Sequence, residues 1–148
     1  MKEEKWVQIC KIQGFEEIRS CYWISSSDKD KIINRDTGKR LKPYINHGYS
    51  LVKLITNQGK IKNCRIHVLK AKAFIFSPNP LGANLVRHLD DIKTNNAIVN
   101  LSWGTRSDNA QDSIRNGHYN HEAAARGRAI GGAKGRAVVA NNRNNQRR

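Results

Sequence analysis

The chain of 148 residues is short of acidic residues: 12 Asp and Glu stand against 27 Lys and Arg, which gives a formal net charge of +15. A basic excess of this size on a small protein indicates a polyanionic partner, most often a nucleic acid. The chain also lacks an apolar run of about 18 residues that could span a bilayer, and no long apolar segment of the secretory type follows its charged start. We therefore expect a cytoplasmic protein that binds nucleic acid and does not enter a membrane.

Cysteine is scarce as well. Cys10, Cys21 and Cys64 are an odd number, which argues against a disulfide framework. Cys64 and His67 have the C-x-x-H spacing of zinc ligands, and the other two cysteines could complete a set of four. A zinc site usually offers two tight ligand pairs, whereas ten residues separate Cys10 from Cys21. We therefore interpret the cysteines as small buried thiols, with zinc as the less favoured alternative.

The most informative stretch surrounds His88. A short apolar strand ends at this histidine, a run of turn-forming residues follows at 90–96, and an apolar, strand-favouring run resumes at 98–103. Thr105 or Ser107 can then cap a helix. The pattern predicts the order strand, loop, strand, helix, with His88 at the end of the first strand.

This stretch resembles the HNH endonucleases of the His-Me finger, or ββα-metal, class, in the branch common in phage genomes and homing endonucleases. The matching segments are R-H-L-D at 87–90, N-N at 95–96, N-L-S-W-G-T at 100–105 and D-N at 108–109. Upstream segments resemble the small module that often precedes such nuclease domains, so the likeness covers roughly residues 6–117. A single H…N…N pattern would carry little weight, but this many matching segments in order make the resemblance specific.

The expected fold is α+β, in three parts. A small antiparallel β-rich, nuclease-associated module at 1–60 precedes an HNH ββα-metal domain at 61–118 and a basic Ala/Gly/Arg/Asn-rich tail at 119–148. The module is expected to include a hairpin turn at 57–60. A short helix from about Val68 to Phe76 should open the nuclease domain. The tail is predicted to be partly helical or disordered; it either orders on DNA or serves only as a solubilising end.

The resemblance implies roles for individual residues in the site. His88 would be the general base, and Asn100 would brace the loop and hold the other ring nitrogen of His88 in one tautomer. Asn109 would present its carbonyl oxygen to a single Mg²⁺ or Mn²⁺ ion, the kind of hard cation that prefers oxygen ligands. Related enzymes often have a metal ligand at the position of Arg87, which cannot bind a cation. Asp90 is therefore an alternative metal ligand, and Arg87 is expected to contact the scissile or an adjacent phosphate.

Two further residues leave alternatives open. Asp91 stands where the family usually has glycine; this carboxylate could help to hold a metal, or the side chain could strain a turn that requires a positive φ. His67 is a second candidate functional histidine, although we favour a packed residue that orients the predicted helix.

Basic residues are spread along the expected strands, the second helix and the tail. The candidates for contact with the DNA backbone are Lys39, Arg40, Lys42, Arg106, Arg115, Arg126 and Arg128. The alternative for those on strands is that they only solvate exposed edges and discourage strand pairing. If they bind phosphates, affinity should fall steeply with salt.

Together these observations predict a metal-dependent DNA endonuclease that nicks or cuts double-stranded DNA, using Mg²⁺ or Mn²⁺ rather than zinc. The resemblance places its ββα segment in the minor groove at the scissile phosphate; a monomer would nick, and a homodimer or two encounters would cut both strands. The alternatives are an inactive HNH-fold protein that only binds nucleic acid, suggested by Arg87, and a basic accessory protein of phage packaging. A phage-encoded protein would act in the host cytoplasm.

Overall fold

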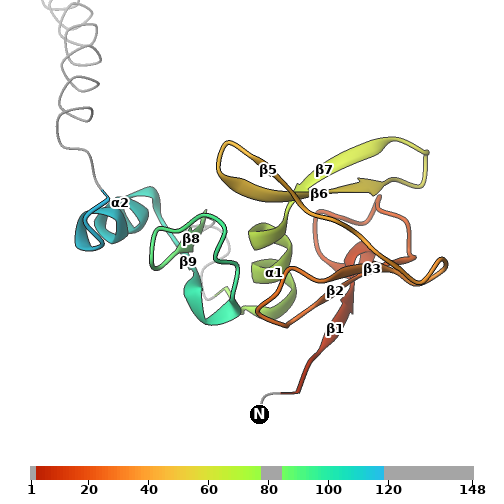
Figure 1. The fold of residues 1–148 in the computed structure, drawn as a ribbon, viewed down its shortest axis with the longest axis horizontal. Helices are drawn as coiled ribbons and strands as arrows, with labels where there is room; N and C mark the ends of the chain where they lie inside the picture. The colour runs from red at the N-terminus through yellow and green to blue at the C-terminus, as the bar shows by residue number, and fades with distance from the viewer. Residues whose placement is uncertain (1–2, 78–84, 119–148) are drawn as a thin grey trace, which may run out of the picture. The chain divides into compact units, whose positions relative to one another are not determined.

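The computed structural model describes residues 3–77 and 85–118. Met1–Asn116 form one compact unit, and a second unit starts at Gly117. The predicted tail at 119–148, with Arg126 and Arg128, lies outside the described residues. The fold is mixed α/β with antiparallel strands and few helices (Figure 1). No helix within the described ranges has the length and apolar character needed to cross a bilayer.

An antiparallel four-stranded sheet in the order β1-β2-β3-β4 starts the chain. Its strands are β1 Trp6–Gln8, β2 Tyr22–Ser25, β3 Ile32–Asn34 and β4 Lys39–Arg40, and a short 3₁₀ turn at Ile9–Lys11 follows β1. The β3–β4 turn forms because Asn34 Oδ1 accepts hydrogen bonds from the backbone N–H groups two and three residues later.

The second sheet has three antiparallel strands in the order β5-β6-β7, namely β5 Tyr44–Asn46, β6 Tyr49–Ile55 and β7 Ile61–Arg65. The predicted hairpin turn at 57–60 is confirmed: the Thr56 N–H donates to the Lys60 carbonyl at 2.8 Å, and Gly59 has a φ of +80°. Our expected boundary between module and nuclease domain falls in this turn.

Helix α1, Ile66–Phe74, follows β7 without a loop. It begins and ends two residues earlier than predicted (Val68 to Phe76). Arg65 is both the last residue of β7 and the extended N-cap of the helix, and the Ile66 side chain is fully buried, so the chain turns directly into the core. α1 occupies the middle of the unit and contacts strands of all three sheets (Figure 1).

The predicted order strand, loop, strand, helix is present as β8 Leu85–His88, β9 Leu101–Gly104 and α2 Arg106–Arg115. β8 and β9 are antiparallel, with His88 opposite Leu101. Residues Ile98–Asn100, which we predicted as strand, form a 3₁₀ turn because the Asn100 N–H bonds back to the Ala97 carbonyl. Thr105, rather than Ser107, caps α2: it forms a capping box with Asp108.

α1 is shared by two apolar clusters. Ile66 and Leu69 pack with aliphatic side chains of the first two sheets, whereas Ala71 packs with Val86 of β8 and Leu101 of β9. Each fully buried aliphatic side chain contributes about 1.5–3 kcal/mol. The helix therefore holds the β8–β9 pair, and His88 at its end, in a fixed position against the amino-terminal sheets.

Candidate active site

The side chain of His88 is buried at the end of β8. Its Nε2 lies 3.0 Å from Asn96 Oδ1. Its ring also packs against His67, with ring centroids 4.9 Å apart, and against Tyr49 at 6.3 Å. The imidazole is thus held between one polar partner and two rings that come from other elements of the fold.

The hydrogen-bond partner of the His88 ring is Asn96 Oδ1, whereas we expected Asn100 in this position. Asn96 is buried, and its Nδ2 donates to Asp30 Oδ2 at 2.9 Å. This bond orients the amide so that its oxygen faces the imidazole. Because an amide oxygen only accepts hydrogen bonds, Nε2 carries the ring proton in this network and Nδ1 of neutral His88 keeps a lone pair.

Asn100 instead braces the loop, which is the other part of the role we expected. Its Nδ2 donates to Asp90 Oδ1 and to the Asn95 carbonyl, both at 2.9 Å, and its Oδ1 accepts from the Asp90 N–H at 3.1 Å. A buried amide with three partners holds both sides of the 88–100 loop together.

Asp90, the predicted alternative metal ligand, already accepts three hydrogen bonds. The Asn100 amide and the Ile92 N–H donate to Oδ1, and the Asn95 amide donates to Oδ2 at 2.7 Å. Burial tends to raise the pKa of Asp90, but the bonds from Asn95, Ile92 and Asn100 outweigh it and lower that pKa below its ordinary value. Since a carboxylate has about four acceptor positions, Oδ2 retains capacity for one more partner.

Asp91 occupies the left-handed region, with a φ of +58°, and its Oδ2 accepts a hydrogen bond from Ser113 Oγ at 2.9 Å. The sequence alternatives for this residue were a metal ligand or a strained turn. The geometry is that of a turn that prefers glycine, and the bond to Ser113 ties this turn to α2.

The conformation of Asp91 can be tested by comparing Asp91→Gly with Asp91→Ala, since both remove the carboxylate. We expect the free energy of unfolding of the glycine variant to be about 1 kcal/mol higher, because the Cβ of alanine makes the left-handed conformation unfavourable and glycine has no Cβ. Urea unfolding of the two variants measures this difference. An alanine variant as stable as the glycine variant would contradict the strained turn.

Arg87 contacts a carboxylate within the protein. Its Nη1 lies 2.7 Å from Oδ2 of Asp112, whose side chain is 1% exposed, and Arg115 Nη2 binds the other oxygen of Asp112 at 2.7 Å. The Arg87 side chain also runs against Gly104, where a Cβ atom would lie 2.7 Å from Arg87 Nε. Arg115 Nη2 also donates to the Leu89 carbonyl at 3.2 Å, so both arginines, which we predicted as phosphate contacts, connect α2 to β8 and the loop after it.

Asn109 lies half-buried in the first turns of α2. The preceding residue, Asp108, uses its carboxylate in the capping box, and hydrogen bonds from the backbone and side chain of Thr105 lower its pKa. Of the D-N pair that matches the family, Asp108 fixes the start of the helix, and Asn109 follows it on α2 with a half-buried side chain.

His67 is packed rather than positioned as a base. It is buried on α1 and stacks on Tyr49 with centroids 5.2 Å apart. Burial, the neighbouring His88 and the Arg65 guanidinium lower the pKa of His67 to about 3. Such an imidazole is a poor proton acceptor at neutral pH. The geometry favours the packed role over the functional one.

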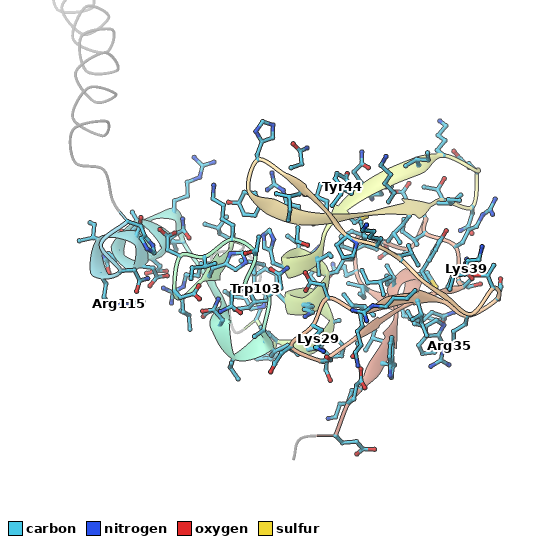
Figure 2. All side chains as sticks on the ribbon, viewed as in Figure 1. Lys29, Arg35, Lys39, Tyr44, Trp103 and Arg115 are labelled. Atoms are coloured by element: carbon cyan, nitrogen blue, oxygen red, sulfur yellow. The ribbon has the colours of Figure 1, made fainter. Side chains whose placement is uncertain are left out.

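Two basic side chains lie near the site, and the others are exposed elsewhere on the described unit. The exposed cations of Arg65 and Lys93 lie over the Tyr49 ring, at 4.8 and 4.9 Å from its centroid. Lys39 and Arg40 are exposed on β4, in the first sheet, and Lys42 is exposed just after it. Figure 2 shows Lys39 and Arg35 together at one end of the unit and Arg115 at the opposite end. Arg106 is exposed at the start of α2.

Tyr49, Asp30 and Lys70 were not predicted from the sequence as part of the site, and Asn96 had no predicted role of its own. One signal was present: Lys70 is a charged residue one turn after Ile66 on an otherwise apolar face of α1. Its side chain is fully buried, and its ammonium lies 3.2 Å from Asp30 Oδ1. A lysine at such a position needs a buried counter-charge, so its presence indicates that an upstream carboxylate packs against α1.

Within residues 3–77 and 85–118, no three His, Cys, Asp or Glu side chains gather in an arrangement that could hold a metal ion. Cys21 and Cys64 are buried thiols, as we predicted, and Cys10 is half-buried. Burial raises the pKa of Cys64 to about 11, which keeps it protonated and unreactive.

Three comparisons place the chain among known proteins. Residues 80–111 match the family described as HNH endonuclease. Two curated relatives, both described as uncharacterized HNH endonucleases of Acanthamoeba polyphaga mimivirus, are 35% identical over 113 residues and 33% identical over 115 residues. These alignments cover 76% and 78% of this chain but 31% and 27% of the relatives, so the chain spans about a third or less of their length.

A solved structure is similar to the fold as a whole. It is that of the HNH homing endonuclease I-HmuI, from work on its DNA binding and cleavage, with a TM-score of 0.64 and 28% sequence identity. The match covers 86% of this chain and 68% of that one, so it extends well beyond the segment around His88. The family match at residues 80–111, the similarity to the curated relatives and the shared fold together support an HNH endonuclease.

Proposed function

We propose that the chain is a metal-dependent DNA endonuclease of the ββα-metal class, which hydrolyses phosphodiester bonds of double-stranded DNA with His88 as general base. The observation that carries the proposal is the orientation of this histidine: Asn96 Oδ1 engages Nε2, so that Nδ1 keeps the lone pair. The family match at residues 80–111 and the likeness to a DNA-cleaving homing endonuclease support the same assignment.

In this proposal Nδ1 of His88 takes the proton from the attacking water. An imidazole suits this task because a base whose pKa lies near the working pH combines availability with driving force. His67 cannot substitute for it, since its pKa is about 3. The hydrogen bonds between Asn100 and Asp90 hold together the two ends of the loop after His88, which keeps the imidazole in a fixed position.

A divalent cation would be held by Asp90 and Asn109, with Mg²⁺ or Mn²⁺ as the proposed ion. Both residues offer hard oxygen donors, and Asp90 Oδ2 has room for one further partner. A site with so few protein ligands fits Mg²⁺, which keeps several waters and binds substrate phosphates. When bound, the ion would stabilise charge on the scissile phosphate and the leaving oxygen.

The same proposal gives the basic surface a role in DNA binding. Arg65 and Lys93 flank the site, and Lys39 and Arg40 on β4, with Lys42 just after it, add exposed positive charge on the first sheet. The β8–β9–α2 segment would lie in the minor groove at the scissile phosphate. One such site cuts one strand, so a monomer is expected to nick and a homodimer to cut both strands.

The proposal is tested on supercoiled plasmid incubated with Mg²⁺, with Mn²⁺ or with EDTA. We expect nicked or linear DNA with either metal and intact plasmid with EDTA. An inactive protein that only binds DNA is the second candidate, favoured by Arg87, which stands where related enzymes have a metal ligand and is paired with Asp112. A gel shift without cleavage in any metal would establish that candidate.

The basic residues of the first sheet can be tested through the salt dependence of DNA binding. Replacing Lys39, Arg40 and Lys42 together by alanine should reduce the slope of log Kd against log salt by about 0.9 for each phosphate that these side chains neutralise in the wild type. Lys5→Ala is the control, because Lys5 is an exposed lysine next to Glu3 and Glu4 in the sequence. An unchanged slope in the triple variant would show that these residues only solvate the edge of the sheet.

A further inference from the structure

A buried polar chain runs from α1 to the imidazole of His88. Lys70 is fully buried and its ammonium lies 3.2 Å from Asp30 Oδ1. Asp30 Oδ2 accepts from the Asn96 amide at 2.9 Å, and Asn96 Oδ1 meets His88 Nε2 at 3.0 Å. The chain therefore links a residue upstream of β3 to the end of β8.

The positive charge of Lys70 keeps Asp30 ionised, so that Asp30 acts as a hydrogen-bond acceptor in this network. Its ammonium also donates to the backbone carbonyls of Ser27 at 2.9 Å, Lys29 at 3.3 Å and Asn96 at 3.1 Å. These carbonyls are uncharged acceptors, so Asp30 is the one anion among the groups that the ammonium contacts and is its counter-charge. An ionised Asp30 has no hydrogen to give, and whatever faces its Oδ2 must donate.

This requirement determines which way round the Asn96 amide lies. If the amide were reversed, its oxygen would face the Asp30 carboxylate and two acceptors would meet without a hydrogen between them. The observed orientation leaves only the amide oxygen for His88. Nε2 must then be the protonated nitrogen, and the reversed orientation would require the proton on Nδ1.

We propose that Asp30, paired with Lys70, is a positioning residue that fixes His88 as the Nε2–H tautomer through the Asn96 amide. The proposal rests on the proposed role of His88 as general base and adds residues of the amino-terminal segment and α1 to the site. Asp30 does not touch the reacting atoms. It acts by deciding which ring nitrogen of His88 has the lone pair.

The test measures the tautomer directly, by the ring ¹⁵N shifts of His88 in histidine-labelled protein at an alkaline pH where imidazole is neutral. His88→Gln identifies the signal. We expect Nε2–H in the wild type and a shift towards Nδ1–H in Asp30→Asn, because an amide at residue 30 can donate to a reversed Asn96. Ser50→Ala is the matched control, because Ser50 donates to the same Asp30 oxygen at 3.0 Å but does not orient Asn96. In this variant His88 should remain the Nε2–H tautomer.

The kinetic readout is kcat against KM on plasmid DNA. Asp30→Asn should lower kcat by about 10²-fold or more, within the range that general-base catalysis contributes, with little change in KM. Ser50→Ala should leave both nearly unchanged. A folded Asp30→Asn protein that keeps the Nε2–H tautomer and the wild-type kcat would overturn the proposal.

Asp30→Asn leaves the Lys70 ammonium buried without its counter-charge, which could prevent folding. The second variant, Asp30→Leu with Lys70→Met, removes both charges together. Asn96 then loses its acceptor and turns freely, so a mixture of tautomers is expected, and a single Nε2–H form would overturn the proposal. If the wild type cleaves no DNA, the proposed function fails, whereas the tautomer shifts still decide the role of Asp30.

Discussion

Replacing His88 by alanine is expected to lower the rate of DNA cleavage by about 10²- to 10⁴-fold while leaving DNA binding nearly unchanged. That range is what a general base contributes. The change removes the ring that Asn96 orients, but it leaves the cations around Tyr49 and on β4 in place. Single-turnover cleavage with Mg²⁺, compared with a gel shift in EDTA, separates chemistry from binding.

His67→Gln is the matched control for this experiment. His67 is also a buried histidine, and its ring is in contact with that of His88, so its replacement disturbs the same packing. Because its pKa of about 3 makes it a poor base, we expect cleavage by His67→Gln to stay within about tenfold of the wild type. Wild-type cleavage by His88→Ala would place the base elsewhere, and equal losses in both variants would show that packing alone was disturbed.

The second large effect is the dependence of stability on pH. His67 has an ordinary pKa of 6.5 in the unfolded chain and one of about 3 in the folded protein, because of burial, His88 and Arg65. Between these values the unfolded state binds a proton that the folded state does not. The contribution of His67 to stability is therefore complete above pH 6.5 and is lost as the pH falls towards 3, at about 1.4 kcal/mol per pH unit.

Urea unfolding at pH 6.5 and at pH 5 measures this contribution. Over this interval we expect the wild type to lose about 2 kcal/mol more than His67→Gln, in which the titrating group is absent. The comparison between the two proteins cancels the carboxylates, which titrate in both. Equal losses in the two proteins would mean that His67 is protonated in the folded state at pH 5.

The fold around His88 could be predicted because its signals are local. Turn-forming residues separate two apolar runs, Thr105 caps the helix that follows, and Gly117, with a φ of +72°, lies just beyond its end. The shift of α1 by two residues comes instead from tertiary packing, which local signals do not show. Val68 and Phe76 look like helix limits in isolation, but the burial of Ile66 starts the helix earlier.

The partners of the site residues could not be predicted in the same way. Asp30 and Asn96 are 66 residues apart in the chain, and Arg87 meets Asp112 across 25 residues. Hydrophobic periodicity says which face of an element is buried, not which polar groups meet when elements pack. The resemblance implied roles for Asn100 and Arg87. In the structure, however, His88 Nε2 meets Asn96 rather than Asn100, and Arg87 pairs with Asp112.

The buried ammonium of Lys70 has a consequence for recombination between nucleases. A segment that begins at residue 61 carries Lys70, Asn96 and His88 but leaves Asp30 behind, together with the carbonyls of Ser27 and Lys29. Grafting that segment onto a foreign DNA-binding module would strand a positive charge in an apolar interior unless the new module offered a carboxylate at the same place. Exchange of the amino-terminal segment should therefore succeed only where the donor and recipient share this acid–base pair.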